Sequence, residues 1–234
     1  MKKRTFIITN VLLLIITLCV SIVAFMPQKV QSINGGQSYD AIYNGNRQNS
    51  NVSLMFNVYE NTQIVNDIVS LLNKNGVTAT FFVGGCWADD NLETLKLIVN
   101  SGHELANHGY FHKDHKVLSE SENRREILDN NNIIRALTGV NMTLFAPPSG
   151  SFSKTTLKVA YTLGYKTIMW SKDTIDWRDS DKSLIIKRAT NNLENGDLIL
   201  MHPKKHTLEC LEQIILKIKE QGYNLVTVSQ NIKE

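Results

Sequence analysis

Two histidines in the middle of the chain stand at a spacing that suits a metal site. The segment GHELANHGYFHKDH holds four of the six histidines, and His108 and His112 are four residues apart. On a helical turn this spacing places both imidazoles on one face, as in two-histidine metal sites. A histidine-rich surface loop without a ligand would show the same spacing. We expect His103 and His115 to be structural, with His115 as a reserve ligand.

A second set of reactive side chains lies further along the chain. His202 follows the apolar run LILM, and an imidazole there could protonate a leaving group near neutral pH. A capping or core histidine is the alternative. In the segment DTIDW, Asp176 could orient that histidine and Trp177 offers an aromatic face for a sugar ring. Asp173 could equally cap a helix or a turn.

The segment FAPPSGSFS predicts a rigid loop. Pro147 and Pro148 fix their φ angles, and Gly150 allows a tight turn. Its Ser-Gly pair is not a nucleophile elbow, because the Gly-x-Ser-x-Gly pattern is missing. The alternative to a functional role is simply a well-formed loop.

The elements that must position these residues follow a repeated pattern of helix, glycine and short strand. Glycine suits the left-handed position just after a helix. Ser119 and Glu122 fit a capping box that begins the helix after the histidine segment. With a first strand at 52–57, seven strands alternate with helices, which predicts a parallel sheet. The other six runs are VTATFFV after Gly76, HELANH after Gly102, VNMTLF after Gly139, YKTIMW after Gly164, DLILMH after Gly196 and YNLVTVS after Gly222.

Unusual residues fall at the carboxyl ends of at least five of these strands, which favours a barrel over an open sheet. In a β/α barrel such ends converge on one mouth, whereas an open sheet gathers its site at one switch point. The residues concerned are Asn57, Cys86 with Trp87, His108, Pro147 with Pro148, Asp173 with Asp176 and Trp177, and His202.

The N-terminus resembles a targeting segment. Three basic residues within the first four positions precede an apolar stretch from Phe6 to Met26. We interpret residues 1–26 as a signal peptide or membrane anchor, with a slight preference for the retained anchor. Residues 27–50 read as a linker and 51–234 as the folded domain. Either way the domain is expected outside the cytoplasm, anchored to the membrane or secreted.

Charge and cysteine content exclude some classes of protein. The chain has 25 Lys and Arg residues and 22 Asp and Glu residues, which gives a net charge of +3. The three basic residues near the N-terminus account for this excess, so the rest of the chain is close to neutral. A nucleic-acid partner therefore has no electrostatic support. Cys86 and Cys210 lie far apart in sequence, and we expect two ordinary thiols rather than a disulfide framework.

Taken in order, the motifs TFFVGG, GHELANHGYFH, FAPPSG, DTIDW and LILMH resemble the polysaccharide deacetylases of carbohydrate esterase family four, the NodB-homology domain. Within that family they most resemble the sporulation-associated branch, and the resemblance covers about residues 52–232. It implies a distorted (β/α)7 barrel that removes N-acetyl groups from peptidoglycan-like or chitin-like glycan with a divalent metal, usually zinc.

Residue by residue, the resemblance assigns the metal to His108 and His112. It makes His202 the catalytic acid and Asp176 the carboxylate that tunes it. Trp177 lines the acetyl pocket, and we place Pro147 and Pro148 with it in the substrate-binding set.

Three positions depart from the family pattern. The stretch Met55-Phe56-Asn57-Val58-Tyr59 stands where the family has Thr-Phe-Asp-Asp-Gly, so the catalytic base becomes the amide Asn57 and the third metal ligand becomes Val58. Ala146 stands where the family has an Arg that pairs with the base. The loss of the base and the loss of the Arg fit each other, because without a carboxylate at position 57 a buried guanidinium at position 146 would lack its partner.

Two functions therefore remain open. One is an active deacetylase, in which Glu60, Asp114 or Asp173 replaces the missing base. The other is a catalytically inactive glycan-binding or structural protein of the cell envelope on the same fold.

Overall fold

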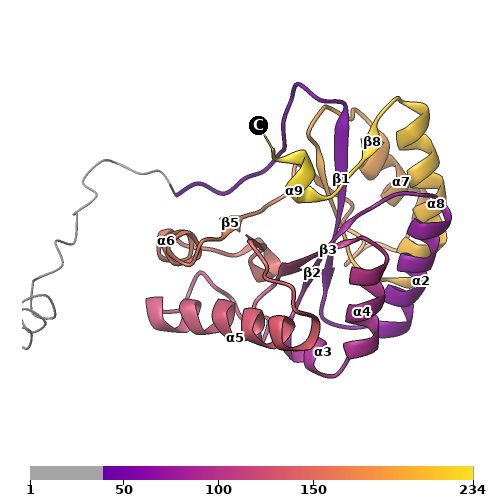
Figure 1. Cartoon of the computed structure of the whole chain (residues 1–234). Helices are drawn as coiled ribbons and strands as arrows, with labels where there is room; N and C mark the ends of the chain where they lie inside the picture. The colour runs from indigo at the N-terminus through magenta and orange to yellow at the C-terminus, as the bar shows by residue number, and fades with distance from the viewer. Residues whose placement is uncertain (1–38, 234) are drawn as a thin grey trace, which may run out of the picture. The chain divides into compact units, whose positions relative to one another are not determined.

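The computed structural model describes residues 39–233, which form a distorted barrel of parallel strands (Figure 1). The strands pair in the order β5-β4-β3-β2-β1-β7-β6, and β8 pairs with the first part of β1. β5 and β6 share no ladder, so the barrel is open between them. The bounds are β1 Asn51–Val58, β2 Thr80–Val83, β3 Glu104–Asn107, β4 Leu144–Phe145, β5 Lys166–Thr167, β6 Lys172–Asp173, β7 Leu198–Met201 and β8 Asn224–Leu225.

All seven predicted strands are present, and the predicted distorted (β/α)7 barrel is confirmed. The two-residue β6 is an addition to the prediction. It consists of Lys172 and Asp173, the second of which opens the motif DTIDW, and both residues pair with β7. Such a short strand carries too few residues to show a period in sequence.

Helices cover the outer side of the strands. The expected start and end of α5 are confirmed, since a capping box joins Ser119 with Glu122 and Gly139 follows the helix at φ 75°. The bounds are α2 Thr62–Lys74, α3 Gly85–Asp89, α4 Leu92–Asn100, α5 Glu120–Thr138, α6 Lys154–Thr162, α7 Lys182–Thr190, α8 Lys205–Glu220 and α9 Val228–Asn231, with a 3₁₀ turn, η1, at Pro148–Gly150.

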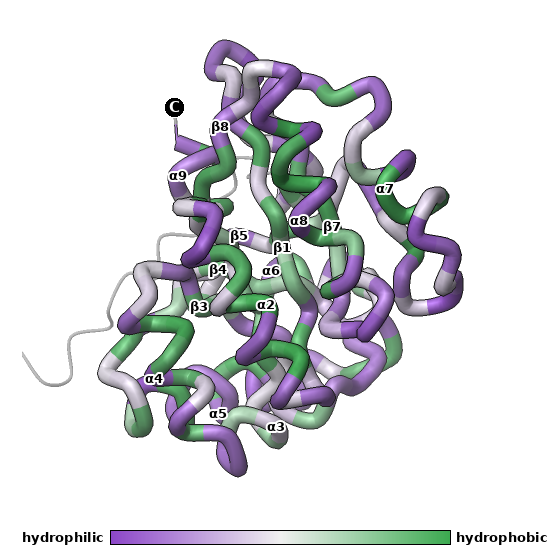
Figure 2. Tube along the Cα trace, turned by 90° about the vertical axis from the view of Figure 1, so that its right-hand side faces the viewer, coloured by the Kyte–Doolittle hydropathy of each residue, from purple (hydrophilic) through white to green (hydrophobic). Residues whose placement is uncertain are grey.

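Side chains of β1 alternate between two apolar clusters. Leu54, Phe56 and Val58 belong to the larger cluster, which includes the buried faces of the helices. Met55 belongs to the smaller cluster inside the barrel, and Figure 2 shows β1 as a largely hydrophobic strand. Because side chains of a strand alternate between its faces, Asn57 follows Met55 on the interior side. The strand thereby aims Asn57 toward the mouth of the barrel.

Part of the segment that we assigned to a linker packs on the domain. Ile42 N–H donates to Thr167 O at 2.9 Å, and Met169 N–H donates to Ile42 O at 2.8 Å. Gly45 N–H donates to Gly196 O at 2.7 Å. The compact unit accordingly starts at Tyr39 rather than at residue 51. The polar composition of the segment concealed these contacts, because they use backbone groups.

The hydrophobic segment 1–26 and the first part of the linker lie outside the described residues. Within residues 39–233, none of the helices combines the length and the apolar character that a membrane crossing requires.

Candidate functional site

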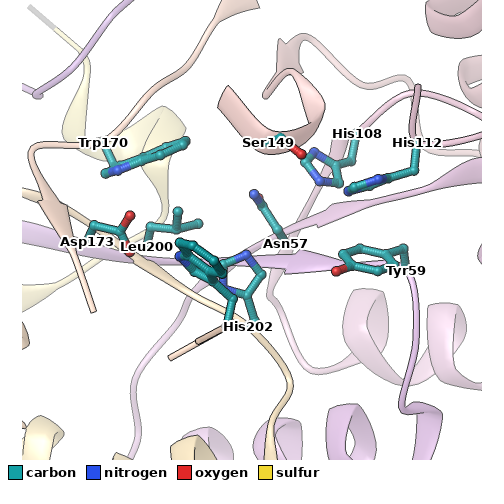
Figure 3. Close-up of a pocket in the computed structure, with 10 residues that line it drawn as sticks. Asn57, Tyr59, His108, His112, Ser149, Trp170, Asp173, Leu200 and His202 are labelled. Carbon is teal, nitrogen blue, oxygen red and sulfur yellow. The ribbon is translucent and has the colours of Figure 1, made fainter. Parts of the chain in front are cut away.

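A pocket of about 270 Å³ opens at the carboxyl ends of the strands (Figure 3). The side chains around it come from β1, β6 and β7 and from the segments that follow β1, β3, β4, β5, β6 and β7. They are Asn57, Tyr59, His108, His112, Ser149, Trp170, Asp173, Trp177, Leu200 and His202. The structure therefore brings the two histidine motifs and the tryptophan of DTIDW into one cavity, as the barrel prediction required.

His108 has one ring nitrogen free to bind a metal. Its Nδ1 lies 2.8 Å from Ala146 O, and its Nε2 is buried without a hydrogen-bond partner among the described residues. Burial, followed by the nearby His112, lowers the pKa of His108 to about 3. The imidazole is therefore neutral. Its Nδ1–H donates to the carbonyl oxygen of Ala146, which leaves a free lone pair on Nε2. This is the arrangement of a metal-ligating histidine and its supporting acceptor.

His112 reaches the pocket by a route different from the one we predicted. The spacing of four suggested a helical turn, but residues 108–115 form an irregular loop in which His112 has a φ of 56°. The loop still places the His112 ring 5.1 Å from the His108 ring and 4.2 Å from the Tyr59 ring, centroid to centroid. Burial lowers the pKa of His112. The pair thus stays together although the helix is absent.

A buried carboxylate holds the loop that carries His112. Glu126 on α5 accepts the backbone N–H groups of Tyr110 at 3.0 Å and Phe111 at 2.8 Å. Lys113 Nζ lies 3.4 Å from the other oxygen of the same carboxylate. Because these amides have no partner in regular secondary structure, Glu126 fixes the path of the backbone on the way to His112.

Two asparagines and a histidine extend this support. Asn130 Nδ2 donates to Asn107 Oδ1 at 3.0 Å and to Gly109 O at 2.9 Å. Asn123 Oδ1 lies 2.7 Å from His115 Nδ1. His115 is therefore buried in the framework rather than in the pocket, as expected of a structural residue. Sequence analysis missed the polar stripe of α5, although its spacing of three and four residues was visible.

His202 and Asp176 form a buried pair on the other side of the pocket. His202 Nδ1 lies 2.8 Å from Asp176 Oδ1, and the His202 backbone N–H donates to Asp176 Oδ2 at 2.8 Å. Thr207 Oγ1 donates to the same Oδ2 at 2.7 Å. The carboxylate fixes the ring orientation, so that Nε2 is the nitrogen available to a ligand. The predicted partnership of these two residues is present in the structure.

Backbone strain gathers in the loops of the pocket. Positive φ angles outside glycine occur at Asn61, His112, Ser149 and Ile175, each in a segment that follows a strand end, and at Asn192 elsewhere in the described residues. Ile175 is β-branched, for which a φ of 55° is a true outlier. Such strain persists where surrounding contacts enforce it, and it clusters at functional sites.

The three departures from the family pattern are buried. Asn57 is 2% exposed, and its Oδ1 has no hydrogen-bond partner among residues 39–233. Val58 packs in the helix-side cluster and Ala146 in the interior cluster. Across the same residues no set of three His, Cys, Asp or Glu side chains could hold a metal. The residues present therefore fit a divalent metal through two imidazole nitrogens only.

Of the three carboxylates that could replace the base, one lies in the pocket. Glu60 is paired with Lys204. Asp114 accepts the Ser151 hydroxyl at 2.6 Å and does not line the cavity. Asp173 does line it, and Figure 3 shows it across Asn57 from the histidine pair.

Other predicted and unpredicted residues complete the lining. Pro147 and Pro148 are not part of it, because they form the start of η1 and the turn presents the next residue, Ser149, to the cavity. Pro148 is buried against Gly109 instead. Sequence analysis also missed Tyr59 and Trp170. Tyr59 lies two residues after the predicted strand 52–57 and Trp170 ends the predicted strand YKTIMW, which was the available signal.

Comparison with known proteins shows which protein family the chain resembles. The family model described as polysaccharide deacetylase matches residues 44–168. The uncharacterized protein YlxY of Bacillus subtilis is 37% identical over 195 residues, which is 83% of this chain and 61% of that protein. The peptidoglycan-N-acetylmuramic acid deacetylase PdaA of Bacillus subtilis is 30% identical over 198 residues, 82% of this chain and 75% of that protein.

A solved structure agrees with these matches. A crystal structure described as a CE4 family pseudoenzyme from Bacillus anthracis aligns with a TM-score of 0.81 and 37% identity, over 85% of this chain and 70% of that one. Fold, pocket and relatives point the same way, and the chain belongs to the polysaccharide deacetylase family.

Proposed function

We propose that this protein is a metal-dependent hydrolase that removes N-acetyl groups from peptidoglycan-like glycan. One observation carries the proposal: the histidine pair, His202 with its buried partner Asp176, and Trp177 surround a single pocket. The peptidoglycan deacetylase PdaA among the relatives supports this choice of glycan.

Each retained group has a task that its geometry allows. Trp177 is 54% exposed at the pocket and offers a ring face to the sugar. His202, oriented by Asp176, would protonate the departing amine from Nε2. His108 and His112 would hold a divalent metal, with zinc the best match to two imidazoles, and a bound metal supplies Lewis-acid polarisation of the acetyl carbonyl. Asp173 is the carboxylate left in the pocket to accept a proton from water.

The test combines metal content with release of free amine from N-acetylated glycan. Full-length protein should carry metal that is lost in His112→Ala, and its turnover should disappear in His202→Ala while metal stays bound. His206→Ala is a matched control, because His206 contacts the Asp176 backbone carbonyl outside the lining. Turnover that survives in His202→Ala would contradict the assigned acid.

A second candidate function is glycan binding without turnover. It is favoured by Asn57, Val58 and Ala146, because an amide has no useful basicity and a buried valine cannot ligate. The pseudoenzyme from Bacillus anthracis is a relative with the same fold. Tight binding of glycan, with neither stoichiometric metal nor amine release, would establish this function in place of hydrolysis.

The cellular setting belongs to the proposal as well. The basic and apolar N-terminal segment supports an extracytoplasmic location, anchored or secreted. A role in sporulation rests on the resemblance of the motifs. Fractionation of cells, with the protein followed by antibody, would contradict the location if it were recovered from the cytoplasm.

A further inference from the structure

Asp173 is a pocket carboxylate that lacks a cationic partner. One of its oxygens, Oδ1, accepts the Ile175 backbone N–H at 2.8 Å. Asp173 takes part in none of the ion pairs found among residues 39–233. Figure 3 shows it with Trp170 and Leu200 on one side of Asn57, while His108 and His112 lie on the other. We call Trp170, Asp173 and Leu200 the acidic end of the pocket.

Two arginines beside this end of the pocket are already engaged. Arg178, whose pKa is raised chiefly by Asp179 and also by the Asp173 charge, donates to Asp179 Oδ1 at 2.9 Å. Arg188 lies 2.7 Å from the other oxygen of Asp179. No lysine or arginine is among the residues that line the pocket. A negative charge therefore faces the cavity with room for a cation from the ligand.

Aromatic side chains frame the same space. The Trp170 ring packs closely on Gly150, where an added Cβ would stand 2.7 Å from the ring. Trp177 lines the pocket and is 54% exposed. Aromatic rings stack on the apolar faces of sugars and attract cations through their π-systems. A carboxylate in the same lining as two such rings suits a ligand that is both a sugar and a cation.

We propose that the acidic end binds the ammonium group of an amino sugar that has lost its acetyl group. This inference rests on the proposed function and specifies the acetylation state of the sugar that is bound. An N-acetyl group is neutral, so it would leave the Asp173 carboxylate desolvated and unpaired. An ammonium ion would donate to Asp173 Oδ2 and lie against the aromatic rings. Glycan that is at least partly de-N-acetylated is therefore the preferred ligand.

Calorimetric titration of full-length protein tests the inference with two probes. The probes are β-1,4-linked glucosamine and N-acetylglucosamine oligomers of equal length, at a pH that keeps the amines protonated, with a chelator present to prevent turnover. The glucosamine oligomer should bind about tenfold tighter, as expected for one charge-assisted hydrogen bond. Asp173→Asn should abolish that preference by weakening binding of the glucosamine oligomer about tenfold.

Two features keep the test specific. The Asp173→Asn variant would retain a side-chain oxygen that accepts the Ile175 N–H, so the turn is preserved. Glu60→Gln is the matched control. Glu60 follows the lining residue Tyr59 but does not itself line the pocket, so the substitution removes one negative charge without changing the pocket surface. It should leave the preference intact.

Equal or tighter binding of the N-acetylated oligomer would overturn the inference and leave the proposed function standing. A preference that survives in Asp173→Asn would also overturn it. Failure of both oligomers to bind would contradict the proposed function itself, and the inference with it.

Discussion

Replacement of Asp176 by alanine should destabilise the protein and disable His202 together. The substitution leaves three donors without an acceptor: His202 Nδ1–H, the His202 backbone N–H and the Thr207 hydroxyl. The Asp176 side chain is 0% exposed and that of His202 is 11% exposed, so water replaces the carboxylate poorly. Each buried unsatisfied donor costs about 1–3 kcal/mol, and breaking a buried pair costs about 3–5 kcal/mol in all.

We therefore expect Asp176→Ala to lower the free energy of unfolding by about 4 kcal/mol. Asp176→Asn keeps an acceptor for the backbone N–H and the hydroxyl, so its loss should be about 1–2 kcal/mol. Urea unfolding followed by circular dichroism measures both. The asparagine variant should remain folded but inactive, because its amide NH₂ would face Nδ1 and favour the wrong tautomer. An Asp176→Ala variant within about 1 kcal/mol of the parent protein would refute the reasoning.

Three further predictions follow from the same structure. Asn57→Asp, Val58→Asp and Ala146→Arg together should raise amine release, whereas no gain would show that the chemistry uses other groups. Glu126→Ala should cost about 2–4 kcal/mol in urea unfolding and weaken metal binding, because two backbone amides lose their acceptor; unchanged metal affinity would contradict its positioning role. The pKa of His103 is lowered from 6.5 to about 4 by burial. Between these two pH values the unfolded chain therefore binds more protons than the folded protein. The free energy of unfolding should fall as pH drops from 6.5 to about 4, and a urea-derived free energy that stays constant over this range would contradict this.

The triple substitution contains its own structural difficulty. Val58 packs in the apolar cluster beside the helices, so Val58→Asp alone would bury an unpaired charge. Ala146 is fully buried, and Ala146→Arg needs the carboxylate of Asn57→Asp as its partner. Ala146→Arg alone should therefore be less stable than Ala146→Arg combined with Asn57→Asp, and urea unfolding of these two variants, of Asn57→Asp alone and of the parent protein measures the coupling.

Much of the fold could be predicted from sequence because local signals agreed with one another. The capping box at Ser119 marked the start of α5, and Gly139 marked its end. The strand ends were visible as well, since Asn57 and His202 each follow an apolar run. Their convergence on one cavity then followed from the geometry of a parallel barrel.

The rest required coordinates because it depends on irregular backbone. His112 sits at positive φ in a loop, which no periodic pattern reports. Ser149 enters the pocket instead of the prolines before it, because the turn η1 rotates it inward. Ile42 packs through backbone hydrogen bonds and through a single apolar side chain, so the polar segment around it gave no periodic sign of packing.

A crystal structure with a bound N-acetylated chitooligosaccharide tests the central claim most directly. We expect one sugar ring against Trp177, with its nitrogen substituent directed toward His202 and its acetyl carbonyl toward His108. A saccharide seated on another face, with this pocket empty, would contradict the assignment of the site.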